Sequence, residues 1–289
     1  METFMAEKRS LEGFGEDAFI KRHYEIANRL GKIISSFPLC EEDERYNLAT
    51  PIVMALGRDI AAMNKLKTSG LGYQSLPLMR VVIERLITFY YLMSCDSEEM
   101  ENYEAYSTQK TYRKFQTEIE INGKKYGRIG NQISVDKENT NSSISLEDFP
   151  EEVQEAVKKF TGPKGRQKTR WSNKSLAQKL SVIDESGLLN ISILMIALAE
   201  TYDDASEMLH GTIYGCTIEF STYIMQQRIS EINQENINEI INKEYKRWMS
   251  SNYVLLNSLI NQYAKFVSKR LNINDNITLL EAISKEIYG

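Results

Sequence analysis

Two mainly apolar stretches of the sequence carry polar side chains at intervals of four residues. These side chains are Arg80 and Glu84 on the stretch 76–94, and Tyr202, Ser206 and His210 on the stretch 191–211. Because an α-helix turns by about 100° per residue, residues four apart share one face and can touch. Each stretch is therefore predicted to be an apolar helix with one polar stripe.

A charge that is removed from water destabilises the fold unless it is paired, so we expect the two stripes to pack against each other. Arg80 would then pair with Glu84, and the second stripe, including His210, would complete the hydrogen bonding. In one interpretation the cluster only fixes the register of the two helices. In another it lines a pocket with acid–base capacity. A third alternative is that the stripes do not meet.

Several catalytic chemistries lack their sequence signatures. The patterns GxSxG, GxxxxGK[ST] and GxGxxG do not occur, and the chain has only two histidines and three isolated cysteines. We therefore expect no cofactor and no metal, although Glu84, His210 and a carboxylate at Asp203 or Glu207 could hold a divalent cation. Metal-free RNA cleavage remains open, because His210 could serve as the base and Arg80 as the cation beside the phosphate.

A second candidate site is a basic segment in a chain whose net charge is −5. No acidic residue occurs between positions 157 and 183. Its candidate phosphate- or nucleic-acid-binding residues are Lys164, Arg166, Lys168, Arg170, Trp171 and Lys174. Cations beside an aromatic ring can hold phosphates and stack on a base. Alternatively, the segment is a solvated loop that pairs with the acidic stretch 147–155, or Arg170 and Trp171 are structural.

The elements that position these residues are predicted to be helices, because prolines and glycines are few and fall between periodic stretches. The expected helices cover 16–36, 51–67, 76–94, 97–118, 146–160, a stretch after 172, 190–210, 213–229, 234–271 and a short stretch after 276. The pair Asn122-Gly123 predicts a hairpin turn within an irregular insert at 121–145.

The predicted fold class is all-α: a helical bundle with long antiparallel helices and one irregular or hairpin insert. We expect a single domain over 1–289. Its C-terminal extension, 213–289, has a broad apolar face that suits self-association or a partner protein. The first residues lack the apolar core of a signal peptide, and no run approaches the roughly 20 apolar residues that span a bilayer. The expected location is the cytoplasm, with no membrane partner.

The order of three motifs resembles a widespread bacterial helical family of unknown function. The motifs are Arg80-x-x-x-Glu84, then Arg170-Trp171, then Tyr202-x-x-x-Ser206-x-x-x-His210 followed by Gly211. The resemblance covers roughly residues 50–215. It implies an all-α fold and a common site for the two stripes, but no reaction. The long insert at 121–145 is a departure from the family.

A more distant similarity links the chain to the HEPN ribonucleases, which are also small helical proteins. Their signature places an arginine four to six residues before a histidine, and no arginine lies between Arg170 and His210 here. By analogy alone, we expect a binding or effector module in bacterial stress or phage defence, with RNA or a nucleotide as partner. The alternatives are a metal-independent HEPN-like ribonuclease and a structural interaction protein without a site.

Overall fold

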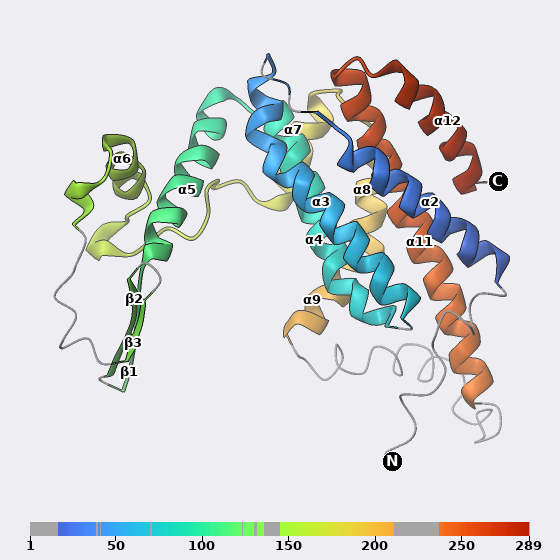
Figure 1. Cartoon of the computed structure of the whole chain (residues 1–289), viewed down its shortest axis with the longest axis horizontal. Coiled ribbons are helices and arrows are strands. Elements are labelled where there is room, and N and C mark those ends of the chain that lie inside the picture. Colours follow the sequence, from blue (N-terminus) through green and yellow to red (C-terminus); the bar gives the residue numbers. More distant parts are fainter. Residues whose placement is uncertain are drawn as a thin grey trace. The chain divides into compact units, whose positions relative to one another are not determined.

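The structure is a computed structural model that describes residues 17–38, 40, 42–69, 71–122, 124–129, 132–135, 145–210 and 237–288 (Figure 1). The chain divides into two compact units. The first combines Met1–Ser94 with Lys179–Gly289, and the second is Cys95–Gln178. The single domain that the sequence predicts stays a prediction, because a compact unit is defined by contacts and a domain by its ability to fold alone.

The first unit is built from helices. They are α2 (Ala18–Ser35), α3 (Glu44–Thr68), the 3₁₀ turn η1 (Tyr73–Ser75), α4 (Leu76–Ser94), α8 (Ser192–Ala197), the π turn η5 (Leu198–Tyr202), α9 (Asp203–His210), α11 (Ile237–Arg270) and α12 (Asn274–Tyr288). Helix α7 (Leu176–Glu185) contains the boundary between the units. The predicted all-α fold is confirmed, and α4 has the predicted bounds.

The core of the first unit lies where neighbouring helices pack face to face. Helix α3 packs between α2 and α4, and α11 packs against α2 and α12. On α4, Phe89 and Tyr90 are buried and meet Tyr263 and Phe266 of α11 edge to face. Such aromatic pairs bury large apolar areas and fix the orientation of the rings. The strongly apolar α4 is therefore the central helix of this unit.

Helix α3 begins seven residues before the predicted start at Pro51. The Asp43 side chain caps it by accepting a hydrogen bond from the backbone nitrogen of Tyr46 at 3.0 Å. Arg270 of α11 donates to the same carboxylate at 2.9 Å, which ties this cap to the core. Pro51 lies exposed within the helix. The cap at Asp43 and its partner on α11 therefore override the local start signal at Pro51.

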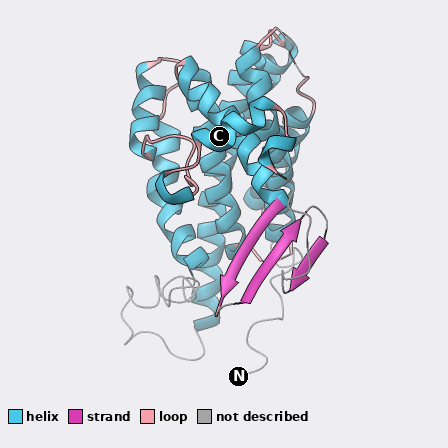
Figure 2. Ribbon diagram, turned by 90° about the vertical axis from the view of Figure 1, so that its left-hand side faces the viewer, coloured by secondary structure: helices cyan, strands magenta, loops and turns pink. Residues whose placement is uncertain are grey.

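The second unit contains α5 (Ser97–Phe115), the strands β1 (Gln116–Ile121), β2 (Lys124–Ile129) and β3 (Gln132–Val135), the 3₁₀ turns η3 (Leu146–Asp148) and η4 (Pro163–Gly165), and α6 (Glu151–Lys159). The strands form an antiparallel sheet in the order β1-β2-β3 (Figure 2). Asn122 has a φ of 53° in the turn between β1 and β2, as the Asn-Gly pair predicts. The hairpin insert is confirmed, and it begins five residues earlier than expected.

Some predictions fall on residues that the structure does not describe. The expected helix at 213–229 and the first part of the C-terminal extension lie outside the described residues, so self-association stays a prediction. Among the helices that are described, none combines the length and the apolar character needed to cross a membrane.

A buried lysine joins α3 to α11. Lys67 is 2% exposed, and its Nζ donates to Oδ1 of Asn252 at 2.9 Å and lies 4.1 Å from the ring centre of Tyr253. Burial lowers the pKa of Lys67 to about 7. The folded protein therefore releases this proton at a pH where the unfolded chain still holds it.

We expect Lys67→Met to remove part of the pH dependence of stability. Lys67 has a pKa of about 7 when folded and an ordinary value of 10.5. Since the unfolded chain binds more protons between these values, this group makes the free energy of unfolding rise with pH, by roughly 1 kcal/mol per unit. Urea unfolding at pH 7, 8 and 9 should show a smaller rise in the variant. The control Lys65→Met removes an exposed lysine of the same helix and should follow the wild type. If the free energy of unfolding rises equally with pH in the wild type and both variants, the lowered pKa of Lys67 is contradicted.

Candidate functional site

The two polar stripes meet where α4 packs against η5 and α9. All three guanidinium nitrogens of Arg80 donate hydrogen bonds. Nε donates to Oε1 of Glu84 at 3.1 Å, Nη1 to Oγ of Ser206 at 2.7 Å, and Nη2 to the hydroxyl of Tyr202 at 3.4 Å. The sequence-based expectation that Arg80 pairs with Glu84 and that the stripes pack together is confirmed for these four residues, which we call the Arg80 cluster.

Tyr202 closes the network. Its hydroxyl accepts from Arg80 and donates to Oε1 of Glu84 at 2.7 Å. Its ring lies beneath the guanidinium, with the Cζ atom of Arg80 4.6 Å from the ring centre. A cation above an aromatic face is attracted by the ring, and the planar guanidinium also stacks on it. Tyr202 therefore fixes both the position and the plane of the arginine head.

The π turn η5 sets the direction of this tyrosine. A π turn holds one residue more than a turn of α-helix, so α9 is rotated by about 100° relative to an uninterrupted continuation of α8. Within the turn, the hydroxyl of buried Thr201 donates to the carbonyl of Ala197 at 2.6 Å. The sequence predicts one helix over 190–210, and no local signal in these residues marks the π turn.

The cluster is partly open to solvent and carries a fixed charge pair. The side chain of Arg80 is 21% exposed and that of Glu84 is 44% exposed. Burial opposes the charge of Arg80, but the hydrogen bond to Glu84 and the neighbouring negative charge outweigh it and raise the pKa of Arg80. Burial and the hydrogen bond to Glu84 also raise the pKa of Tyr202. At neutral pH the cluster therefore holds a cationic arginine and a neutral tyrosine.

His210 is not part of the network, contrary to the expectation that it completes the hydrogen bonding. It is the last residue of α9 and is exposed, and no hydrogen bond between described residues joins it to the cluster. The physical reason is its place at the exposed end of α9. His210 instead stands one helical turn beyond Ser206, where it is accessible from solvent.

The basic segment lies in the second unit and forms a loop with fixed ends. The backbone nitrogen of Lys168 donates to the carbonyl of Phe160 at 2.9 Å, and the hydroxyl of Tyr106 donates to the carbonyl of Thr169 at 2.7 Å. Trp171 is half-buried and meets the ring of Tyr103 edge to face, with 5.1 Å between the ring centres. These contacts support a structural role for Trp171, as one of the two alternatives predicts.

Three cations of this loop, Arg166, Lys168 and Arg170, are exposed. Among the described residues, none of them forms an ion pair, so the predicted pairing with the acidic stretch 147–155 is not formed there. Lys174 is half-buried, and the side chain of Lys164 lies outside the described residues. The loop thus offers three positive charges to an anionic partner.

The described residues hold no group of three or more histidine, cysteine, aspartate or glutamate side chains that could bind a metal ion. The carboxylates near the cluster do not converge: Asp203 is exposed, whereas Glu84 is held by Arg80 and Tyr202. What the cluster offers chemically is therefore hydrogen bonding with a fixed charge pair.

Comparison with known proteins identifies the family. Residues 60–217, more than half of the chain, match the model of a family of unknown function, DUF5677, so the chain belongs to this family. The match confirms the resemblance seen in the sequence, and it contains both halves of the Arg80 cluster as well as His210. No curated protein and no solved structure matches the chain.

We expect the cluster to couple α4 to α9 measurably. In a double-mutant cycle with Arg80→Met and Ser206→Ala, the interaction free energy from urea unfolding should be about 1 kcal/mol, because the hydrogen bond involves a charged donor in a partly buried setting. The matched control is His210→Ala, which should change stability by less than about 0.5 kcal/mol because its side chain is exposed. Strictly additive effects of the first two substitutions would contradict the observed contact.

Proposed function

We propose that this member of the DUF5677 family is a binding module whose Arg80 cluster recognises the base of a nucleotide or of single-stranded RNA. The observation that carries the proposal is the fixed, partly exposed pair of Arg80 and Glu84. A second contribution comes from the exposed cations of the basic loop, which suit phosphate groups.

The hydrogen bonds of the cluster favour binding over nucleophilic catalysis. The Oγ atom of Ser206 accepts from the cationic Arg80, which withdraws electron density from the oxygen that a nucleophile would use. The hydroxyl of Tyr202 already donates its proton to Glu84. The raised pKa of Tyr202 keeps this phenol protonated, and the hydrogen bonds hold both hydroxyl groups in place as binding groups.

The groups that the cluster leaves for a ligand are complementary to a base edge. A guanidinium has five N–H donors, of which three are used here. The proton of the Ser206 hydroxyl adds a donor, and the second oxygen of Glu84 adds an acceptor. Base edges present donors and acceptors side by side, and unpaired bases of single-stranded RNA are read through them. Because the charges of Arg80 and Glu84 offset each other, the cluster suits such a neutral polar group better than an isolated anion.

Phosphate groups require a separate source of positive charge. Arg166, Lys168 and Arg170 are exposed in the second unit, and each cation that neutralises a phosphate strengthens binding and makes it sensitive to salt. The cytoplasmic location and an effector role in bacterial stress or phage defence stay predictions that rest on the sequence and on analogy.

We expect Arg80→Lys to weaken binding of single-stranded RNA at least about tenfold. Lysine keeps the charge but lacks the planar fork that contacts Glu84, Ser206 and Tyr202 together, and a bidentate contact to a base contributes roughly 1–3 kcal/mol. The measurement is fluorescence anisotropy with a labelled RNA of mixed sequence, in a chelating buffer at two salt concentrations.

The matched control is Arg85→Lys. Arg85 lies on the same helix and forms an ion pair with Asp59 outside the cluster, so this variant should bind RNA within about twofold of the wild type. Melting curves followed by circular dichroism must show that both variants are folded. Equal loss in the two variants, or no RNA binding by the wild-type protein, would refute the proposal.

Metal-independent RNA cleavage is the second candidate function, and the accessible position of His210 favours it. The imidazole stands one turn beyond Ser206, about 6 Å further along the helix axis, and histidine is the side chain that most often serves as a general base. In chelating buffer, we expect any RNA cleavage to disappear in His210→Ala while RNA affinity stays within about twofold. Intact RNA after incubation with the wild-type protein would eliminate this candidate and leave the binding module.

A further inference from the structure

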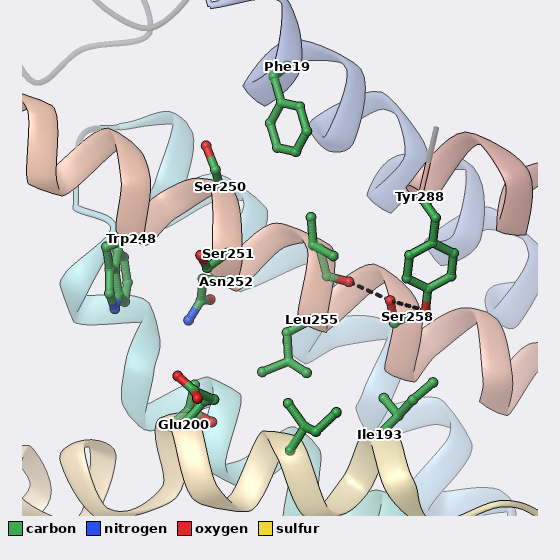
Figure 3. A pocket seen from close by; sticks show the side chains of 13 residues that line it. Phe19, Ile193, Glu200, Trp248, Ser250, Ser251, Asn252, Leu255, Ser258 and Tyr288 are labelled. Carbon is green, nitrogen blue, oxygen red and sulfur yellow. Dashed lines mark hydrogen bonds between the residues drawn. The ribbon is translucent and has the colours of Figure 1, made fainter.

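A pocket of about 570 Å³ opens in the first unit between α11 and the segment formed by α8 and η5 (Figure 3). None of the four residues of the Arg80 cluster lines it. Its volume lies in the range of small-molecule sites, which are typically concave and mostly apolar with a few polar groups. It is therefore a candidate ligand site separate from the one proposed above.

The walls of the pocket combine an apolar body with one polar corner. Apolar side chains come from Phe19 of α2, Ile193 and Ile196 of α8, and Val254 and Leu255 of α11. Phe19 is 43% exposed and Ile196 is 54% exposed, so apolar surface is left in water around the pocket. Burying such surface against a ligand would contribute about 25 cal/mol per Å².

The polar corner is built around Glu200 and Asn252, which project into the pocket from opposite walls (Figure 3). Oδ1 of Asn252 accepts from the buried Nζ of Lys67, which fixes the orientation of the amide. Ser251, beside Asn252 on α11, also lines the pocket. This corner thus offers a fixed set of hydrogen-bonding groups at one end of an apolar space.

Glu200 gives the corner its charge. Among the described residues that line the pocket, it is the one aspartate, glutamate, lysine, arginine or histidine, and it is exposed. Trp248 also lines the pocket, with its ring stacked on Tyr73 at 4.5 Å between centres. The carboxylate can attract an organic cation by charge, and an aromatic ring in the same pocket can attract it through its face.

We propose that this pocket binds a small amphipathic primary amine, with the ammonium group beside Glu200 and the apolar body against Ile193 and Leu255. The proposal does not depend on RNA binding by the Arg80 cluster. No pattern in the sequence identifies Glu200 or Asn252 as a site residue, because the two residues belong to segments about fifty positions apart that meet only in the fold.

The test uses Trp248 as a built-in reporter. The chain has two tryptophans, so Trp171→Phe leaves Trp248 as the single source of indole fluorescence. In this background, the protein is titrated with 4-phenylbutylamine, 4-phenylbutanol and 4-phenylbutyric acid, which share one apolar body and differ in the head group. We expect the amine to bind at least about tenfold more tightly than the acid, with the alcohol between them.

Two variants assign this preference to the pocket. Glu200→Gln should reduce the advantage of the amine over the alcohol to less than about twofold. Ile196→Arg, at an exposed position of the rim, should weaken binding of all three probes because it fills the entrance. The control Glu281→Gln removes an exposed carboxylate of α12 that does not line the pocket, and should leave the order of affinities unchanged. No change in Trp248 fluorescence with any probe, equal affinities, or tightest binding of the acid would overturn the proposal.

Discussion

The arrangement of the first unit depends on the hydrogen bonds that the guanidinium group of Arg80 makes. This group sits on the strongly apolar α4 and is largely withdrawn from water, so its charge must be compensated and its buried donors must be matched by neighbouring groups. Glu84 supplies the charge from the same helix, and Tyr202 and Ser206 supply acceptors from the facing one. These requirements fix how η5 and α9 dock on α4, and the π turn is the local deformation that satisfies them.

The same constraint operates along α11, where buried polar side chains form its contacts with other helices. Asn252 accepts from Lys67 of α3, and the amide of Asn257 donates to the carbonyl of His23 of α2 at 2.9 Å. Burial, together with the charge of Arg22, lowers the pKa of His23, which keeps this ring neutral. Such directional bonds specify one register between long helices, whereas apolar contacts alone tolerate sliding.

Sequence periodicity predicts most of the described helices and the pairing of Arg80 with Glu84, because the spacing of polar residues on an apolar helix is a local property. The same reasoning failed where the outcome depends on packing. Pro51 is a good local start signal, yet Asp43 prevails because Arg270, more than two hundred residues later, pairs with it. His210 shares the spacing of Tyr202 and Ser206, but it lies at the exposed end of α9 and does not join the network. The burial of Lys67 could not be predicted from the sequence, since lysine is rarely a core residue and its contacts with α11 form only in the fold.

The proposed function requires that Arg80 contacts a ligand as well as the opposite helix. The most direct measurement is the NMR signal of the arginine Nε–H groups in ¹⁵N-arginine-labelled protein, with the Arg80 signal assigned by its loss in Arg80→Lys. On addition of single-stranded RNA, we expect the Arg80 signal to shift in a saturable manner while the Arg85 signal stays in place. An Arg80 signal that does not move at saturating RNA would contradict a contact between Arg80 and RNA. The cluster would then have only a structural role, that of fixing the register of the helices.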